Sequence, residues 1–160
     1  MIDDKPNYDR VLENIAACKD VDKLMIFAEN ARKRNVMTVK EAASKQLKSL
    51  IPSCKKGSYE KAFWEMILLY QALLLEHGKP TLKLNKTWKM AMSEGEAEAH
   101  RDWILNGSQV WALDYFLSHV PTAITAEKLL LNNPDIFDVE LQNTANNNLQ
   151  MAKARLSEIK

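Results

Sequence analysis

Apolar residues recur every three or four positions along most of this 160-residue chain, and this spacing constrains the fold more than any other feature. The segment Tyr59 to His77 shows it most clearly. Strict alternation of apolar and polar residues, which a half-buried strand needs, is absent. The pattern predicts an all-α fold, a compact single domain of seven to eight helices around a central apolar helix at about 59–77.

Residues that favour helix ends divide this pattern into segments. We expect Asp20, Ser58 and Thr125 to cap helices, and Thr38 with Glu41 to form a capping box. The predicted helices cover about Tyr8–Cys18, Asp20–Arg34, Thr38–Pro52, Tyr59–His77, Lys86–Ser93, Glu96–Leu105, Gln109–Val120, Thr125–Leu131 and Asp138–Glu158. Thr81 to Lys86 is predicted to be irregular. Four asparagines in the last segment predict a C-terminal helix, within 138–160, that frays or docks only partly.

Length and the lack of targeting signals bound the class of protein. A chain of 160 residues suits one domain, 1–160, with a real core. No apolar run approaches the roughly 18 to 20 residues that span a bilayer. The N-terminus carries acids and no apolar stretch of the kind found in secretory signals. We therefore expect a cytoplasmic protein that does not enter the membrane.

Charge is unevenly distributed although the net charge is only +1. Val39 to Lys89 carries ten lysines and four glutamates, whereas Met90 to Lys160 carries five basic and ten acidic residues. A basic middle and an acidic end give the chain an electrostatic dipole, and the basic part is a candidate binding surface.

The most basic stretch runs from Gly78 to Lys89 and contains no acid. Its candidate partner-binding or nucleic-acid-binding residues are Lys79, Lys83, Lys86, Trp88 and Lys89. Lysines bind phosphates as point charges, and an aromatic ring offers a face on which a base can stack. The alternative is a solvated linker in which Trp88 fills the core. Arginine, the commonest reader of guanine, is absent from this stretch.

Evidence for an enzyme is weaker. Glu96 and His100 lie four residues apart and can begin a metal site, with His77 or His119 as a distant third ligand. The alternative is an ordinary Glu–His pair on a helix surface. No phosphate loop, dinucleotide fingerprint or nucleophile elbow occurs, so we expect no cofactor.

These observations favour a small non-enzymatic binding or adaptor protein that acts through protein–protein contacts and can form homo-oligomers. The surface would come from the basic middle, the aromatic segment Trp103 to Phe116, or the acidic C-terminal helix. The alternative is a nucleic-acid-binding accessory factor that uses the 78–89 lysines. A second alternative is a metal-dependent enzyme whose site is assembled from distant residues.

One resemblance adds to this interpretation. Gly78-Lys-x-Thr-x-x-x-Asn-x-Thr-Trp-x-Met90, with Glu127-x-Leu-x-Leu-x-x-x-Pro-x-x-Phe137 downstream, is similar to small uncharacterised all-helical proteins of bacteria or phages. The resemblance covers about half of the chain. It implies a bacterial or phage origin and no particular activity.

Overall fold

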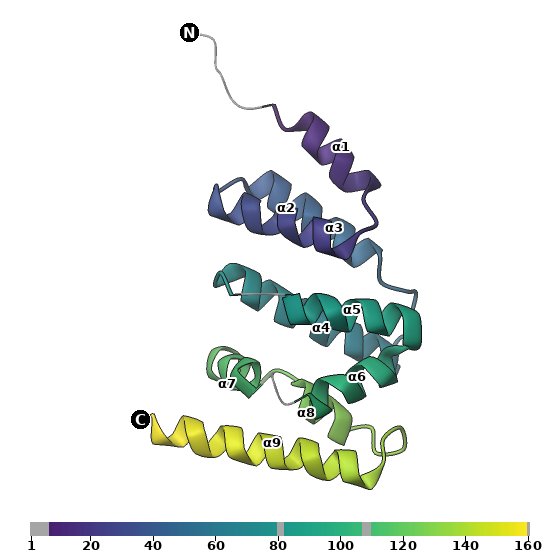
Figure 1. Ribbon diagram of the computed structural model, residues 1–160, viewed down its shortest axis with the longest axis vertical. Helices are drawn as coiled ribbons and strands as arrows, with labels where there is room; N and C mark the ends of the chain where they lie inside the picture. Colours follow the sequence, from purple (N-terminus) through teal and green to yellow (C-terminus); the bar gives the residue numbers. More distant parts are fainter. Residues whose placement is uncertain (1–6, 80–81, 107–109, 160) are drawn as a thin grey trace. The chain divides into compact units, whose positions relative to one another are not determined.

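A computed structural model describes residues 7–79, 82–106 and 110–159 of the chain. Within these ranges the protein consists of nine α-helices and contains no strand (Figure 1). The all-α prediction is confirmed: each of the nine predicted segments contains a helix, although the predicted total was seven to eight.

The helices follow one another with short connections. They are α1 (Asp9–Ala17), α2 (Val21–Lys33), α3 (Met37–Ser49), α4 (Tyr59–Glu76), α5 (Leu82–Glu94), α6 (Glu96–Leu105), α7 (Val110–His119), α8 (Ala126–Leu131) and α9 (Val139–Glu158). None of the helices in the described ranges combines the length and the apolar character that crossing a membrane would need.

Side-chain caps set several helix starts where the sequence predicts them. The backbone N–H groups of the first turn lack partners within the helix, and a short polar side chain can accept from one of them. Asp20 accepts from the N–H of Lys23 at 3.2 Å, and Thr125 accepts from Lys128 at 3.2 Å. Ser58 does the same at the start of α4. These three predicted caps are confirmed.

Two predicted boundaries are wrong. The helix α5 begins at Leu82, so most of the segment predicted to be irregular is helical. Its Leu84, Trp88 and Ala91 are spaced by four and three residues and are all buried, which makes one continuous apolar face. The helix α3 begins at Met37, with Val36 at its N-cap and no side-chain cap bond, so Thr38 and Glu41 form no capping box.

Contacts divide the chain into two compact units. Unit 1 comprises Met1–Ser53 and Leu74–Asn85, and unit 2 comprises Cys54–Leu73 and Lys86–Lys160. The boundary crosses α4 and α5, each of which contributes residues to both units. A single domain over 1–160 stays a prediction.

Unit 1 is built on the pair α2 and α3, which pack side by side (Figure 1). Ala28 of α2 and Ala43 of α3 are fully buried, and small side chains allow helices to approach closely. The helix α1 packs on α3. Gln46 of α3 donates to the carbonyl of Cys18 at 2.8 Å, which ties α3 to the end of α1.

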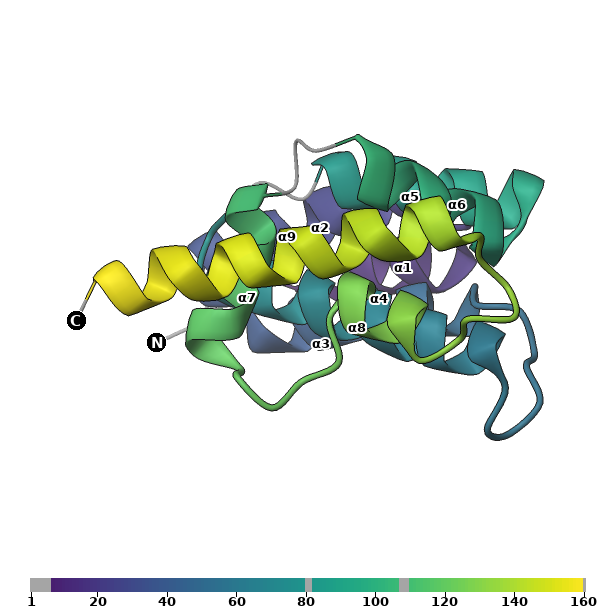
Figure 2. The same ribbon diagram turned by 90° about the horizontal axis from the view of Figure 1, so that it is seen from below.

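Unit 2 has an aromatic core. Tyr70 of α4 stacks on Phe116 of α7, with ring centroids 3.9 Å apart, and meets the edge of Trp103 of α6. The helix α9 lies beside α7 and α8 and runs to Glu158 (Figure 2). It buries Leu141 and Leu149 despite its asparagines. Trp103 and Phe116 are core residues, so they do not provide the partner surface suggested for this segment.

Candidate functional site

The described lysines of the basic stretch are divided between the two units. Lys79 follows α4 in unit 1, whereas Lys86 and Lys89 lie on α5 in unit 2. The side chain of Lys83 lies outside the described part of the chain. Lys86 is exposed, and its Nζ lies 3.6 Å from Oδ2 of Asp102. This carboxylate offsets part of the positive charge of Lys86.

Trp88 is fully buried and does not offer a ring face to a base. Its centroid lies 4.9 Å from that of Trp64 in an edge-on contact. The periodicity of α5 explains this placement, because Leu84, Trp88 and Ala91 share the inward face. The interpretation of Trp88 as a stacking residue is wrong, and the core interpretation is confirmed for it.

The side chains of Glu96 and His100 bind different partners and do not form the pair that the sequence suggested. His100 is buried, with Nδ1 2.8 Å from the Tyr59 hydroxyl and Nε2 2.6 Å from the Ala126 carbonyl. Because a carbonyl only accepts, Nε2 carries the proton and Nδ1 accepts from Tyr59. Glu96 instead accepts from Nε1 of Trp64 at 2.9 Å. Among the described residues no three His, Cys, Asp or Glu side chains gather as metal ligands.

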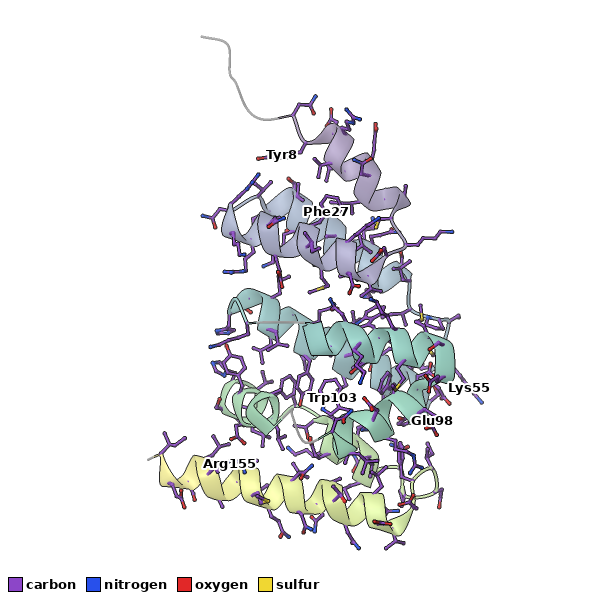
Figure 3. The ribbon with its side chains drawn as sticks, viewed as in Figure 1. Tyr8, Phe27, Lys55, Glu98, Trp103 and Arg155 are labelled. Carbon is purple, nitrogen blue, oxygen red and sulfur yellow. The ribbon has the colours of Figure 1, made fainter. Side chains whose placement is uncertain are left out.

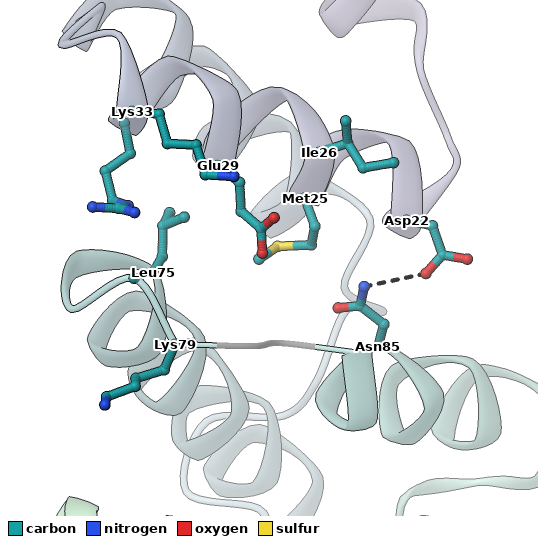
Figure 4. Close-up of a pocket in the computed structure, with 10 residues that line it drawn as sticks. Asp22, Met25, Ile26, Glu29, Lys33, Leu75, Lys79 and Asn85 are labelled. Carbon is teal, nitrogen blue, oxygen red and sulfur yellow. Dashed lines mark hydrogen bonds between the residues drawn. The ribbon is translucent and has the colours of Figure 1, made fainter.

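A groove lies along one face of α2, and we call it the α2 groove. It has a volume of about 420 Å³, within the usual range for ligand sites. All of its described lining residues belong to unit 1. They are Asp22, Met25, Ile26, Glu29, Arg32 and Lys33 of α2, together with Leu75, Gly78, Lys79 and Asn85 (Figure 4).

The α2 groove has different chemistry at its two ends. Figure 4 shows Asp22 and Asn85 at one end, where Asn85 Nδ2 donates to Asp22 Oδ1 at 3.2 Å. Lys33 lies at the other end, with Met25 and Glu29 between. Since the α2 residues follow one another along a helix axis, Arg32 belongs to the same basic end. The groove is therefore acceptor-rich at one end and cationic at the other.

Two polar atoms that line the α2 groove are buried without a hydrogen-bond partner among the described residues. One is the acceptor Oδ1 of Asn85, a side chain only 6% exposed, and the other is the donor Nε of Arg32. Leaving such a group unpaired costs about 1–3 kcal/mol, so unpaired groups in native proteins need an explanation. A ligand that supplies a donor and an acceptor is such an explanation.

Gly78 shapes the basic end of the groove. It ends α4 with φ +65°, while the N–H of Lys79 donates to Leu74 and that of Gly78 donates to Leu75. This is the Schellman pattern that glycine favours. A Cβ at Gly78 would lie 2.8 Å from Nη2 of Arg32, so the missing side chain leaves room for the guanidinium.

The sequence of α2 carries a local signal for this groove. Asp22, Met25, Glu29 and Lys33 recur at spacings of three and four, which puts apolar and charged residues on one helix face. Arg32 and Lys33 also lie in the last turn of α2, where cations meet the negative end of the helix dipole. The opposite wall is formed by the chain near Gly78 and Asn85. This contact depends on the tertiary structure and has no local sequence signal.

A second, smaller groove of about 210 Å³ lies between α1 and the α2–α3 pair. Tyr8 and Phe27, labelled in Figure 3, line it together with Val11, Val36 and Arg34. Its lining is mainly apolar and contains none of the buried unpaired atoms. It therefore gives less information about a ligand than the α2 groove.

Comparisons with known proteins identify no relative of this chain. No protein-family model, no curated protein and no solved structure matches the chain.

Proposed function

We propose that the protein is a non-enzymatic binding protein that takes a short segment of a partner protein into the α2 groove. The observation that carries this proposal is the pair of buried, unpaired atoms, Asn85 Oδ1 and Arg32 Nε, in the wall of one groove. Every peptide unit offers one N–H donor and one C=O acceptor. A peptide therefore carries both the donor and the acceptor that these two atoms lack.

The length of the groove suits a peptide. Asp22 and Lys33 are eleven residues apart, which is about 16 Å along a helix. An extended chain covers this distance with about five residues, at roughly 3.3 Å each. Buried Met25 and Leu75 in the lining can contact apolar side chains of such a segment.

Nucleic acid suits this groove less well than a peptide. Asp22 and Glu29 would repel phosphates, and Trp88 is buried. Binding through Lys79, Lys86 and Lys89 is the competing proposal. It predicts retention on nucleic acid that falls steeply with salt and is lost when Lys83→Glu and Lys86→Glu are combined.

A peptide library tests the proposal. Purified protein is used to select from a phage-displayed library of random decapeptides, and selected peptides are resynthesised and titrated. Ile26→Arg places a charged side chain at the rim of the groove, where Ile26 is 56% exposed, and should weaken binding by at least about tenfold.

Met37→Arg is the matched control. Met37 is also 56% exposed and lies in unit 1, but it does not line the α2 groove. This variant should bind selected peptides as the unchanged protein does. The proposal is wrong if no peptide is enriched, or if enriched peptides bind both variants equally well. Far-UV circular dichroism checks that both variants are folded.

A further inference from the structure

We propose that unit 1 holds a second binding site, in the smaller groove between α1 and the α2–α3 pair, and that this site takes a small aromatic carboxylic acid. We call this groove the α1 groove. Its volume is about 210 Å³, and all of its described lining residues belong to unit 1. It shares no described lining residue with the α2 groove, and the inference does not depend on the proposed function.

Three segments of unit 1 build the walls of the α1 groove. Tyr8 and Val11 contribute from the start of α1, and Val36 and Val39 contribute from the start of α3. The residues on α2 are spaced by three, one and three positions, so they lie on one face of this helix. They are Phe27, Asn30, Ala31 and Arg34.

Both aromatic side chains of unit 1 line this one groove. Among phenylalanine, tyrosine and tryptophan, the sequence ranges of unit 1 contain only Tyr8 and Phe27. Each of the two residues is half-buried, and neither ring contacts another aromatic ring of the described residues. Aromatic rings gain stability from a stacked or edge-on ring beyond the area that they bury. A ligand ring bound in the groove supplies such a partner.

Arg34 sets the charge of the ligand. It is exposed, it is the one charged residue in the described lining, and no acid lines the groove within the described ranges. A guanidinium pairs with a carboxylate through two N–H groups. Asn30 lies one turn before Arg34 on the same face of α2, and its amide can donate to the same carboxylate. A cationic ligand would be repelled by Arg34.

The turn after α2 suits an anion at this position. The C-terminal end of a helix is unfavourable for anions because its last carbonyl groups lack partners. Here the N–H groups of Asn35 and Val36 donate to the carbonyls of Arg32 and Ala31 at 3.1 and 2.9 Å, so these two carbonyls are already occupied. Asn35 has φ +57°, the left-handed conformation that closes this motif. The same turn brings Val36 and Arg34 into the lining.

The size of the α1 groove limits the ligand to one ring. Its volume is below the range of about 300–1,000 Å³ that is usual for drug-sized ligands. Phe27 and Arg34 are seven residues apart on α2, or about 10 Å along the helix axis. A ring joined to its carboxylate by a short aliphatic chain therefore suits the groove better than benzoate. A ligand this small should bind with a dissociation constant of about 0.1–1 mM.

Nuclear magnetic resonance titrations of the whole chain with 3-phenylpropanoate test the proposal. The compound should shift the amide signals of Ala31, Val36 and Val39 in a saturable way. Three related compounds separate the contributions, because 3-phenylpropanamide lacks the charge, hexanoate lacks the ring and 3-phenylpropylamine reverses the charge. The amide and hexanoate should each bind about five- to tenfold more weakly than 3-phenylpropanoate, and the amine should not bind.

Two variants assign these contributions to residues. Arg34→Gln should remove the preference for the carboxylate over the amide, because the guanidinium is the group that distinguishes them. Arg10→Gln is the matched control, since Arg10 is also an exposed arginine of unit 1 but does not line the α1 groove. This control should keep the preference. Tyr8→Leu should reduce the advantage of 3-phenylpropanoate over hexanoate and keep its advantage over the amide.

Several outcomes would overturn the proposal. One is the absence of saturable shifts up to about 10 mM 3-phenylpropanoate, ten times the weakest expected dissociation constant. Another is a set of shifts centred on Met25 and Ile26 of the α2 groove. Equal binding of the amide or of hexanoate excludes this ligand class, and a preference that persists in Arg34→Gln excludes the role of Arg34. The compound series on the unchanged protein decides the ligand class even where a variant does not fold.

Discussion

Gly78 shows how one backbone position affects both stability and the site. Its φ of +65° is unfavourable for other residues, and its missing Cβ gives space to Arg32. Gly78→Ala should destabilise the protein by about 1–2 kcal/mol, the usual cost of a left-handed conformation with a Cβ. It should also weaken peptide binding, since Arg32 must move. Urea unfolding and calorimetry measure the two effects.

Gly57 is the matched control for this change. Its φ is +77°, but a Cβ there would meet nothing within 4 Å. Gly57→Ala should therefore cost about 1 kcal/mol in the free energy of unfolding and leave peptide binding unchanged. Equal effects of the two substitutions on binding would show that the close approach of Arg32 to Gly78 does not shape the groove.

His100 makes the stability of the protein depend on pH. Burial lowers the pKa of His100 from 6.5 to about 4, although its bond to the Ala126 carbonyl acts in the opposite direction. The unfolded chain therefore binds a proton more readily than the folded chain between these two values. The free energy of unfolding should be unaffected by His100 above pH 6.5 and should fall by about 3 kcal/mol in all as the pH decreases toward 4.

Urea unfolding from pH 4 to 7.5 measures this dependence. His100→Gln removes the titrating group, so its stability should change less across this range than that of the unchanged protein. His119→Gln, at an exposed histidine of α7, should keep the full dependence. Glu127 has the opposite effect on the free energy of unfolding. Burial raises its pKa, so the folded chain holds this proton more tightly than the unfolded chain, and stability falls as the pH rises above 4.5. Identical pH curves for the His100 variant and the unchanged protein would contradict the prediction.

At the scale of elements, α7 and α9 share the apolar cluster of Leu113, Leu117, Leu149 and Ala152, and an ion pair between Arg155 and Asp114 joins them as well. Arg155 Nε lies 2.8 Å from Oδ2 of Asp114, and Nη2 donates to Oδ1 at 2.9 Å. Arg155→Lys keeps the charge but loses the two-pronged geometry, so it should cost about 0.5–1 kcal/mol.

A double-mutant cycle checks that this loss belongs to the pair. Combined with Asp114→Asn, Arg155→Lys should cost much less than it does alone. Lys153→Gln, on the exposed side of α9, is the control and should change stability by less than about 0.5 kcal/mol. Additive effects in the cycle would mean that the pair does not stabilise the contact between α7 and α9.

The elements predicted best from the sequence are those whose ends carry a local chemical signal. Thr125 and Asp138 set the starts of α8 and α9 through side-chain bonds to the N–H groups of Lys128 and Leu141. The predicted start of α5 is wrong because the inward face of this helix depends on the burial of Leu84 and Trp88, which is a tertiary property. Thr38 was misjudged because Val36 starts α3 without a side-chain cap.

At the scale of the whole molecule, the site was less predictable than the fold. Helical periodicity is a local property of the sequence, and it predicted the all-α class. The α2 groove joins residues as distant in sequence as Asp22 and Asn85, and no local pattern shows that they meet. Trp88 illustrates the same limit, because neighbouring lysines suggested exposure while the helix face buried it.

The two compact units raise a final question about the whole chain, whether it unfolds in one step. Both α4 and α5 contribute residues to both units, so unfolding one unit would shorten helices that the other uses. Because helices form cooperatively, we expect a single transition and one domain. All four tryptophans, Trp64, Trp88, Trp103 and Trp111, fall within unit 2.

Tryptophan fluorescence therefore reports on unit 2, whereas circular dichroism reports on helices of both units. The two signals should give the same midpoint and the same slope in urea, because the shared helices couple the units. The variant Phe27→Trp adds a fluorescent probe on α2 in unit 1. It should unfold at the same midpoint. Loss of helical signal before the native tryptophans respond would show that unit 1 unfolds by itself, and the prediction of a single domain would then be wrong.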